Sequence, residues 1–292
     1  MKIDAHHHLW QYNEDQYGWI PDEMSVLRSD YLPLELKKAL DKAGVDGTVV
    51  VQARQIAEET SWLLEQADAY PFIRGVVGWV DLQSEKVDDQ LDYFSRDPRL
   101  VGVRHVIHDE VDDEFMMHPA FMRGIGKLLD YNLAYDLLLF PRHLSIAERL
   151  VRRFPNQKFV LDHIGKPNIK DRELEPWLSG LARLASHPNV WCKISGMVTE
   201  ADWQHWERDD FRIYLPDFDF LLFDAVKDDP EDYEFDEAVK ALFTIWKYAH
   251  TKDFLKAVKR VFELIRQIDP QVRFNEYLQI ILKYLELTRE EE

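Results

Sequence analysis

Short apolar runs alternate with longer amphipathic segments through the first two-thirds of the chain. The apolar runs fall at residues 2–8, 47–53, 73–80, 101–107, 133–140, 158–164 and 190–195. Apolar positions at helical spacing mark the segments between them, at residues 33–43, 58–69, 86–95, 119–130, 144–154 and 175–186. Runs such as GTVVVQA are apolar on both faces, which is typical of parallel strands covered by helices. The pattern therefore predicts repeated βα units, in either a (β/α) barrel or a doubly wound sheet.

Chemically versatile side chains occur at or near the ends of several different predicted strands. They are His6, His8, Arg104, His105, Asp136, Asp162, His163 and Lys193. In a barrel, the carboxyl ends of the strands converge on one mouth, where catalytic groups collect. A doubly wound sheet would instead favour a glycine-rich phosphate loop, and neither GxGxxG nor GxxxxGK[ST] occurs in the sequence. The strand ends therefore favour the barrel.

The last third of the chain has a different pattern of apolar and polar residues. One strand-like run spans residues 214–226, an acidic stretch follows, and helical patterns cover 235–250, 253–268 and 272–287. All eleven glycines lie within the first 196 residues. Because glycine is the usual residue at tight connections and helix C-caps, its disappearance predicts a change of architecture near residue 200.

Composition excludes several classes of protein. A single cysteine, Cys192, rules out a disulfide framework or a thiolate zinc cluster. The formal net charge of −18 argues against a nucleic-acid partner, which would require clustered Lys and Arg. No apolar run approaches the roughly 18 residues of a membrane helix, and the first ten residues show neither a basic leader nor an apolar signal core. These features predict a cytoplasmic protein with neither a membrane nor a nucleic acid as partner.

The HxH pair formed by His6 and His8 is a candidate metal site. Two residues apart on a strand, both imidazoles point to one face, and His7 points away. Divalent metals such as zinc accept neutral His nitrogens in this arrangement, with further ligands from other strands. A surface histidine cluster or a tag remnant is the alternative.

Residues 161–167 (LDHIGKP) form a second candidate site. His163 is expected at a strand end as a third metal ligand or a general acid/base, because its ordinary pKa lies near neutrality. A histidine that only caps the strand by hydrogen bonds is the alternative. Lys166 is interpreted either as a group that binds an anionic substrate or as a solvated side chain.

Arg104 lies among apolar residues, so it needs a carboxylate partner or a ligand oxygen. Both interpretations stay open, a structural ion pair with Asp136 and a contact with substrate. Lys193, at the end of another predicted strand, adds a second positive group near the mouth.

Several motifs resemble the amidohydrolase-2 family of metal-dependent hydrolase barrels, in particular its branch of L-fuconolactonase-like sugar lactonases. They are DAHHHLW, GVRHVIHDE, YDLLLFPR, FVLDHIGKP and CKISGMVTEADWQHW, and the resemblance covers residues 1–212. It implies a (β/α)8 TIM barrel that opens a small lactone, with His6, His8 and His163 as metal ligands and His163 also catalytic. Members of the family differ in metal use, so a divalent ion, zinc first, and a metal-free site both stay open. On the substrate side we place Arg104, Asp136, Lys166 and Lys193.

The resemblance breaks after residue 212, because the family's last strand ends in Gly-Ser-Asp-Trp-Pro and this motif does not occur here. Residues 213–292 instead resemble the C-terminal part of recombination-promoting nucleases, a family of transposase-like proteins. We therefore expect an incomplete barrel at 1–212 and a strand plus helical tail of different origin at 213–292. Residues 218–225 are an alternative eighth strand, in which Asp224 replaces the lost catalytic aspartate. This predicts impaired lactonase activity, or alternatively a non-catalytic chimera whose tail mediates protein–protein contact or homo-oligomers.

Overall fold

The computed structural model describes residues 1–18, 20–211, 213 and 214. Residues 1–211 form one unit in which strands and helices alternate strictly. The strands are β1 (Ile3–His7), β2 (Gly47–Val51), β3 (Ile73–Gly78), β4 (Leu100–Val106), β5 (Ala134–Leu138), β6 (Phe159–Leu161) and β7 (Val190–Cys192). The helices are α1 (Pro33–Ala43), α2 (Ala57–Ala69), α3 (Val87–Phe94), α4 (Pro119–Leu128), α5 (Leu144–Arg153) and α6 (Trp177–Ala185).

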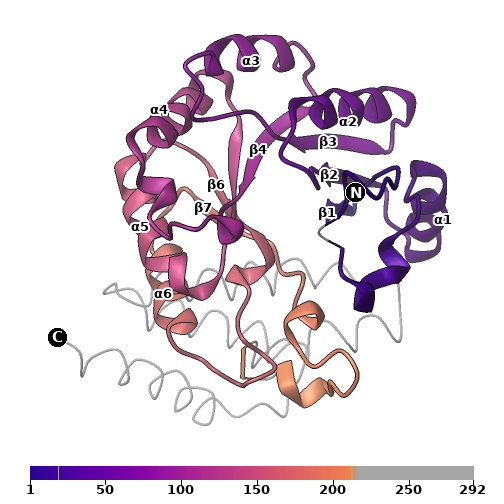
Figure 1. Cartoon of the computed structure of the whole chain (residues 1–292), viewed down its shortest axis with the longest axis vertical. Coiled ribbons are helices and arrows are strands. Elements are labelled where there is room, and N and C mark those ends of the chain that lie inside the picture. Colours follow the sequence, from indigo (N-terminus) through magenta and orange to yellow (C-terminus); the bar gives the residue numbers. More distant parts are fainter. Residues whose placement is uncertain (19, 212, 215–292) are drawn as a thin grey trace. The chain divides into compact units, whose positions relative to one another are not determined.

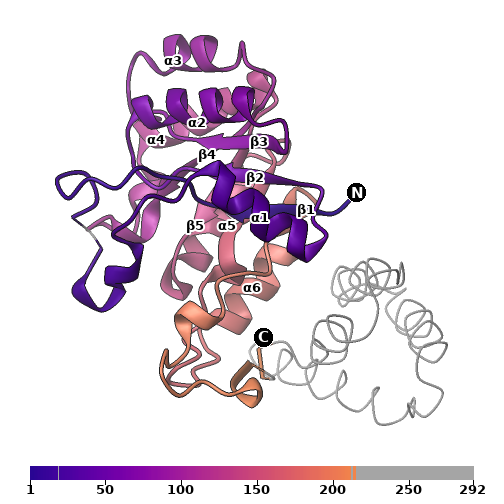
Figure 2. The ribbon, with the colours of Figure 1, turned by 90° about the vertical axis from the view of Figure 1, so that its right-hand side faces the viewer.

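All seven strands are parallel and lie in sequence order, β1 to β7, in a single sheet. Figure 1 shows the sheet curving, with α3, α4 and α5 on its outer side. Figure 2 shows α2 alongside β3, the strand that it contacts most. Seven parallel strands in a curled sheet fit a TIM-like barrel, and the doubly wound alternative is wrong because each strand pairs with its sequence neighbour.

The outer helices bury one apolar stripe each. In α5, Leu144, Ala147, Leu150 and Val151 are fully buried, at the spacing of a single helical face.

Successive side chains of strand β5 point to opposite faces of the sheet. The Tyr135 ring meets Phe121 of α4 with centroids 6.0 Å apart, whereas the next residue, Asp136, pairs with Lys193.

For residues 1–195, the predicted strands and helices are confirmed in number and order, but several of their ends differ. The run at 158–164 was predicted to be strand throughout, yet β6 stops at Leu161 and a tight turn follows. Likewise β7 stops at Cys192, short of the predicted end at residue 195. Both errors have one cause, since polar residues at the mouth carry no period-2 pattern that would mark where pairing ends.

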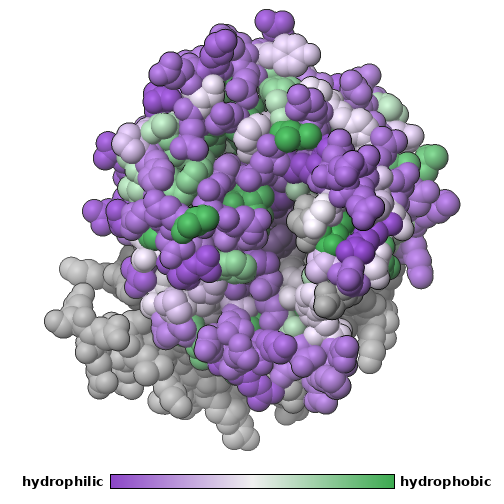
Figure 3. Space-filling view, viewed as in Figure 1, coloured by the Kyte–Doolittle hydropathy of each residue, from purple (hydrophilic) through white to green (hydrophobic). Residues whose placement is uncertain are grey.

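The predictions for the C-terminal part lie outside the described residues. They concern the strand-like run at 214–226 beyond residue 214, the three helical patterns and the replacement of the last strand unit. Within the described residues, no helix has the length and apolar character needed to cross a bilayer. Figure 3 shows that hydrophilic residues predominate on the face seen in Figure 1, with hydrophobic side chains in small separate groups.

Candidate active site at the barrel mouth

Asp162 is the centre of a buried polar cluster at the carboxyl ends of the strands. It directly follows β6 and is fully buried. Its Oδ2 accepts a hydrogen bond from Arg104 Nη1 at 3.0 Å, and its Oδ1 lies 3.0 Å from Lys193 Nζ and 3.4 Å from His6 Nδ1. Side chains from β1, β4, β6 and the end of β7 therefore meet at one carboxylate.

The guanidinium of Arg104 makes hydrogen bonds with Gln52 as well as with Asp162. Besides its bond to Asp162, Nη2 donates to the side-chain Oε1 of Gln52 at 3.0 Å and to the Gln52 carbonyl oxygen at 2.5 Å. The Gln52 amide donates back to the Arg104 carbonyl oxygen at 3.3 Å. The predicted alternative of an ion pair with Asp136 is wrong: the long guanidinium side chain reaches past the neighbouring strand to Asp162.

Lys193 neutralises the second buried carboxylate. Its Nζ donates to Asp136 Oδ2 at 2.5 Å and also lies 3.3 Å from His6 Nδ1. Arg104 and Lys193 thus face Asp136 and Asp162, two cations against two carboxyl groups. Burial and the charge of Asp162 raise the pKa of Asp136 to about 7, although Lys193 and Arg104 oppose the shift, so Asp136 is only partly ionised at neutral pH. Only in such compensated sets are charges stable at this depth, because an unpaired buried ion costs several kcal/mol.

His6 and His8 present their Nε2 atoms to each other at 3.3 Å. His8 Nδ1 lies 2.8 Å from the Val51 carbonyl oxygen, which can only accept, so Nδ1 carries the proton and Nε2 a lone pair. His7 faces the other side of β1, where its Nδ1 meets Thr48 Oγ1 at 2.5 Å, as alternation along the strand predicts.

His163 joins the cluster from the turn after β6. Its ring lies 4.4 Å from the His6 ring, between centroids, and its Nδ1 is 2.9 Å from Ser195 Oγ. The sequence predicted His163 on a strand end, but it occupies the tight turn after β6 with a left-handed backbone, φ +54°.

Burial dominates the protonation states of the cluster. It lowers the pKa of His163 to about 3, with His6 adding to the shift, and it holds the pKa of His8 well below the ordinary value. The pKa of His6 is also lowered by burial, although Asp162 opposes the shift. Burial alone would raise the pKa of Asp162, but His6, Arg104 and Lys193 hold it well below the usual range. At neutral pH the site therefore contains neutral imidazoles around an ionised carboxylate.

This donor set suits a divalent metal ion. His6, Asp162 and His163 each offer a ligand atom, and these atoms lie within 4.8 Å of one another. Asp162 Oδ1, a buried carboxylate oxygen, also faces Lys193 Nζ at 3.0 Å and His6 Nδ1 at 3.4 Å. His8 adds a lone pair aimed at His6 Nε2. Neutral imidazoles and a carboxylate are ligands that zinc accepts.

The other residues singled out from the sequence lie around this cluster or outside the described part. Lys166 forms an ion pair with Glu200 and its Nζ lies 5.6 Å from the Phe140 ring centroid. His105 faces the helices, where its Nε2 meets Glu110 at 2.7 Å and its ring stacks on Phe115. Asp224 lies outside the described residues.

Sequence reasoning missed three residues of the site. Asp162 was noted at a strand end but was not assigned a role, although it is the hub of the cluster. Gln52 ends a fully apolar run, and a lone amide after GTVVV was the available signal. Ser195 carried no signal of its own, since its contact with His163 depends on how β6 and β7 pair.

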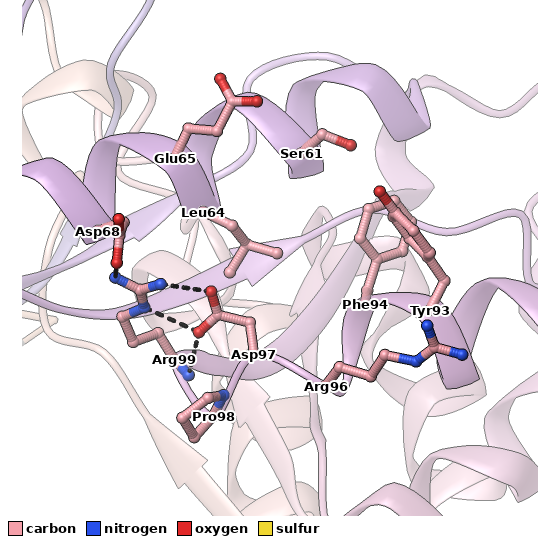
Figure 4. A pocket seen from close by; sticks show the side chains of 10 residues that line it. All are labelled: Ser61, Leu64, Glu65, Asp68, Tyr93, Phe94, Arg96, Asp97, Pro98 and Arg99. Atoms are coloured by element: carbon pink, nitrogen blue, oxygen red, sulfur yellow. Dashed lines mark hydrogen bonds and ion pairs between the residues drawn. The ribbon is translucent and has the colours of Figure 1, made fainter.

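A surface hollow away from the mouth is a different feature. Figure 4 shows it beside α2 and α3, lined by Leu64, Asp68, Tyr93, Asp97 and Arg99 among others, with a volume of about 730 Å³. Arg99 immediately precedes β4, at the end of the strand opposite the mouth. Its guanidinium already bonds Asp97 and Asp68, so these three charged groups are paired with one another.

The curled parallel sheet with histidines and an aspartate at its carboxyl end defines a hydrolase-type barrel. Residues 3–225 match the family model described as amidohydrolase, and the chain belongs to this family. The match extends past residue 212, and the resemblance of residues 213–292 to recombination nucleases stays a prediction.

Two similar relatives are called L-fucono-1,5-lactonase. The protein from Burkholderia ambifaria is 38% identical over 201 residues, which is 69% of each chain. The protein from Burkholderia multivorans is 38% identical over 210 residues, 70% of this chain and 71% of the relative.

Solved structures show the same fold. An amidohydrolase from Burkholderia multivorans with bound Zn has a TM-score of 0.71 and 33% identity, and the match covers 88% of this chain and 95% of that one. A probable 2-pyrone-4,6-dicarboxylic acid hydrolase from Acinetobacter baumannii has a TM-score of 0.61 at 16% identity, over 89% and 92% of the two chains, and shows the fold alone.

Proposed function

We propose that this protein hydrolyses a sugar-type lactone at the mouth of its barrel. The observation that carries the proposal is the cluster of His6, Asp162 and His163, which β1 and the turn after β6 bring together beside Arg104. The family and the names of the two 38% identical relatives support a sugar lactone as the substrate class.

His6, His8, Asp162 and His163 would hold a divalent ion, and the bound Zn of the Burkholderia multivorans amidohydrolase makes zinc the first choice. Such an ion polarises a carbonyl oxygen and lowers the pKa of a bound water. The protein's own part is to keep the ligands in the right protonation state. The Val51 carbonyl fixes the His8 tautomer, and Arg104 with Lys193 keeps Asp162 ionised.

Lactone hydrolysis adds water to the carbonyl carbon and breaks the bond to the ring oxygen, which gives a hydroxy acid. One proton leaves the water and one arrives at the ring oxygen. His163 is neutral and adjoins the cluster, so in a metal-free site we assign it this proton exchange, because a nitrogen that binds an ion cannot also exchange a proton. Lys166, beside Phe140, is the positive group that we assign to the substrate side.

A carboxylate from an eighth strand is the part of this proposal that lies outside the described residues. Since the family's last-strand motif does not occur in the sequence, we propose that Asp224 replaces that aspartate imperfectly and that the activity is reduced. Loss of a positioned general acid/base costs about 10²- to 10⁴-fold in rate.

The test is to incubate the purified protein with L-fucono-1,5-lactone and other aldonolactones and to follow proton release with a pH indicator. We expect ring opening above the buffer rate, with the hydroxy acid identified as the product. A parallel sample treated with a chelator and then with zinc tests the metal ligands. Ring opening at the buffer rate for every lactone, with a Burkholderia L-fucono-1,5-lactonase active in the same assay, would overturn the proposal.

A further inference from the structure

The turn after β6 has a backbone that L-amino acids rarely adopt. His163, Ile164, Gly165 and Lys166 have φ values of +54°, +47°, +74° and +50°, four left-handed residues in succession. Only one of the four is glycine. A left-handed conformation is unfavourable for each residue with a Cβ, so the turn persists only because its surroundings enforce it.

Backbone and side-chain bonds from two other elements hold the turn. The Ile164 N–H donates to the Lys193 carbonyl oxygen at 3.0 Å, which ties the turn to the segment after β7. The Ile164 carbonyl oxygen accepts a hydrogen bond from the indole Nε1 of Trp177 at 2.6 Å. Trp177 is the first residue of α6 and only 2% exposed, so this bond is shielded from water.

The turn places the His163 ring directly against Gly196. A Cβ on Gly196 would lie 2.8 Å from both Cγ and Nδ1 of His163, closer than real atoms approach. Gly196 itself has φ +69°. On the same segment, Ser195 Oγ lies 2.9 Å from His163 Nδ1. The ring is therefore fixed by its backbone on one side and by residues 195 and 196 on the other.

We infer that Trp177 and Ser195 are positioning residues for His163. Trp177 acts through the backbone of Ile164, and Ser195 acts on the ring through its contact with Nδ1, which sets the orientation and the tautomer of His163. The inference rests on the proposed function for its catalytic meaning, but the orientation of His163 is measurable without any activity.

The alternative is that Trp177 is an ordinary core residue whose indole bond serves stability alone. Trp10 provides the matched control, because it is 7% exposed and its Nε1 also donates to a backbone carbonyl, that of Ser29, at 2.9 Å. Trp177→Phe and Trp10→Phe each keep an aromatic ring and remove one buried indole donor.

The experiment records the ring nitrogen resonances of ¹⁵N-histidine-labelled protein, with the His163 signals assigned by their loss in His163→Asn. We expect Trp177→Phe to shift the His163 nitrogen signals and Trp10→Phe to leave them in place. In lactone assays we expect kcat of Trp177→Phe to fall about tenfold to a hundredfold, as for misplaced catalytic groups, with KM nearly constant.

Unshifted His163 signals in a folded Trp177→Phe protein would overturn the role of Trp177, whatever its stability. If Trp177→Phe does not fold, Ser195→Ala decides: a changed His163 tautomer supports the inference, and an unchanged tautomer overturns it. If the wild type opens no lactone, the proposed function fails, but the NMR comparison still decides the orientation of His163.

Discussion

At the scale of single residues, the site depends on Asp162, a carboxylate to which the sequence pattern assigned no role. The sequence predicted His6, His8 and His163 as partners, and the structure places them together. It could not predict which carboxylate Arg104 would pair with, because Asp136 in β5 and Asp162 directly after β6 are equally good candidates. The choice depends on side-chain reach across the sheet, which a one-dimensional pattern does not contain.

Replacing Asp162 by Asn should destabilise the protein by about 3–5 kcal/mol, because it leaves Arg104 and Lys193 with one buried carboxylate between them. Asp88→Asn is the matched control, since Asp88 pairs with Lys127 where both side chains are exposed. That pair is worth about 1 kcal/mol or less. Urea denaturation of both variants gives the comparison, and equal losses would contradict the compensated cluster.

The neutral buried His163 should make stability fall in acid. Its folded pKa of about 3 lies below the ordinary value of 6.5, so between these two pH values the unfolded chain binds more protons than the folded one. The free energy of unfolding therefore decreases as the pH falls from 6.5 toward 3, by up to about 1.4 kcal/mol per pH unit for this group. Denaturation of wild type and His163→Asn at pH 6, 5 and 4 should show a shallower slope in the variant. Parallel curves would mean that His163 is protonated in the folded state.

At the scale of elements, the sequence predicted the βα order well because each apolar run and each helical stripe is a strong local signal. Helix α1 (Pro33–Ala43) has the predicted bounds, with Pro33 opening it and Gly44 ending it at φ +62°. Gly165 and Pro167 predict a turn after β6, but the left-handed backbone of His163, Ile164 and Lys166 was not predictable, since these three residues carry a Cβ. Tertiary bonds from Trp177 and Lys193 impose that conformation.

Two glycines of α4 test how closely the outer helices pack. A Cβ on Gly124 would lie 2.1 Å from the Leu82 carbonyl oxygen, whereas one on Gly126 would meet the Phe154 ring edge at 3.3 Å. Gly124→Ala should therefore destabilise by about 1–3 kcal/mol through overpacking. In Gly126→Ala, the higher helix propensity of alanine, about 0.5–1 kcal/mol, offsets the tighter contact. We therefore expect little change in the free energy of unfolding of this variant. Thermal unfolding of the two variants checks this, and an equally stable Gly124→Ala would contradict the packing of α4 against Leu82.

At the scale of the whole molecule, seven parallel strands and the family match agree on a TIM-like amidohydrolase barrel. The eighth strand of the barrel cannot be assigned from the sequence, which lacks the family's last-strand motif, or from the described residues. The family match reaches residue 225 and thus includes Asp224. The predicted boundary at residues 212–213 and the catalytic role of Asp224 are therefore the points to test.

Asp224→Asn should lower the lactone-opening rate about 10²- to 10⁴-fold if this carboxylate takes the place of the family's last-strand base. Asp219→Asn, a second aspartate of the same run, is the control and should leave the rate unchanged. An unchanged rate in Asp224→Asn would remove Asp224 from the site and leave the reaction to the groups around Asp162.

The most direct test of the central claim is the initial rate of L-fucono-1,5-lactone opening by wild type, His163→Asn and His205→Asn at equal concentration. His205 is the control because its side chain is 77% exposed. Within the described residues, its ring contacts Asp202, three residues earlier in the chain. We predict a wild-type rate above that of buffer, a rate about 10²- to 10⁴-fold lower in His163→Asn, and no change in His205→Asn. A folded His163→Asn protein that opens the lactone as fast as the wild type would contradict the account.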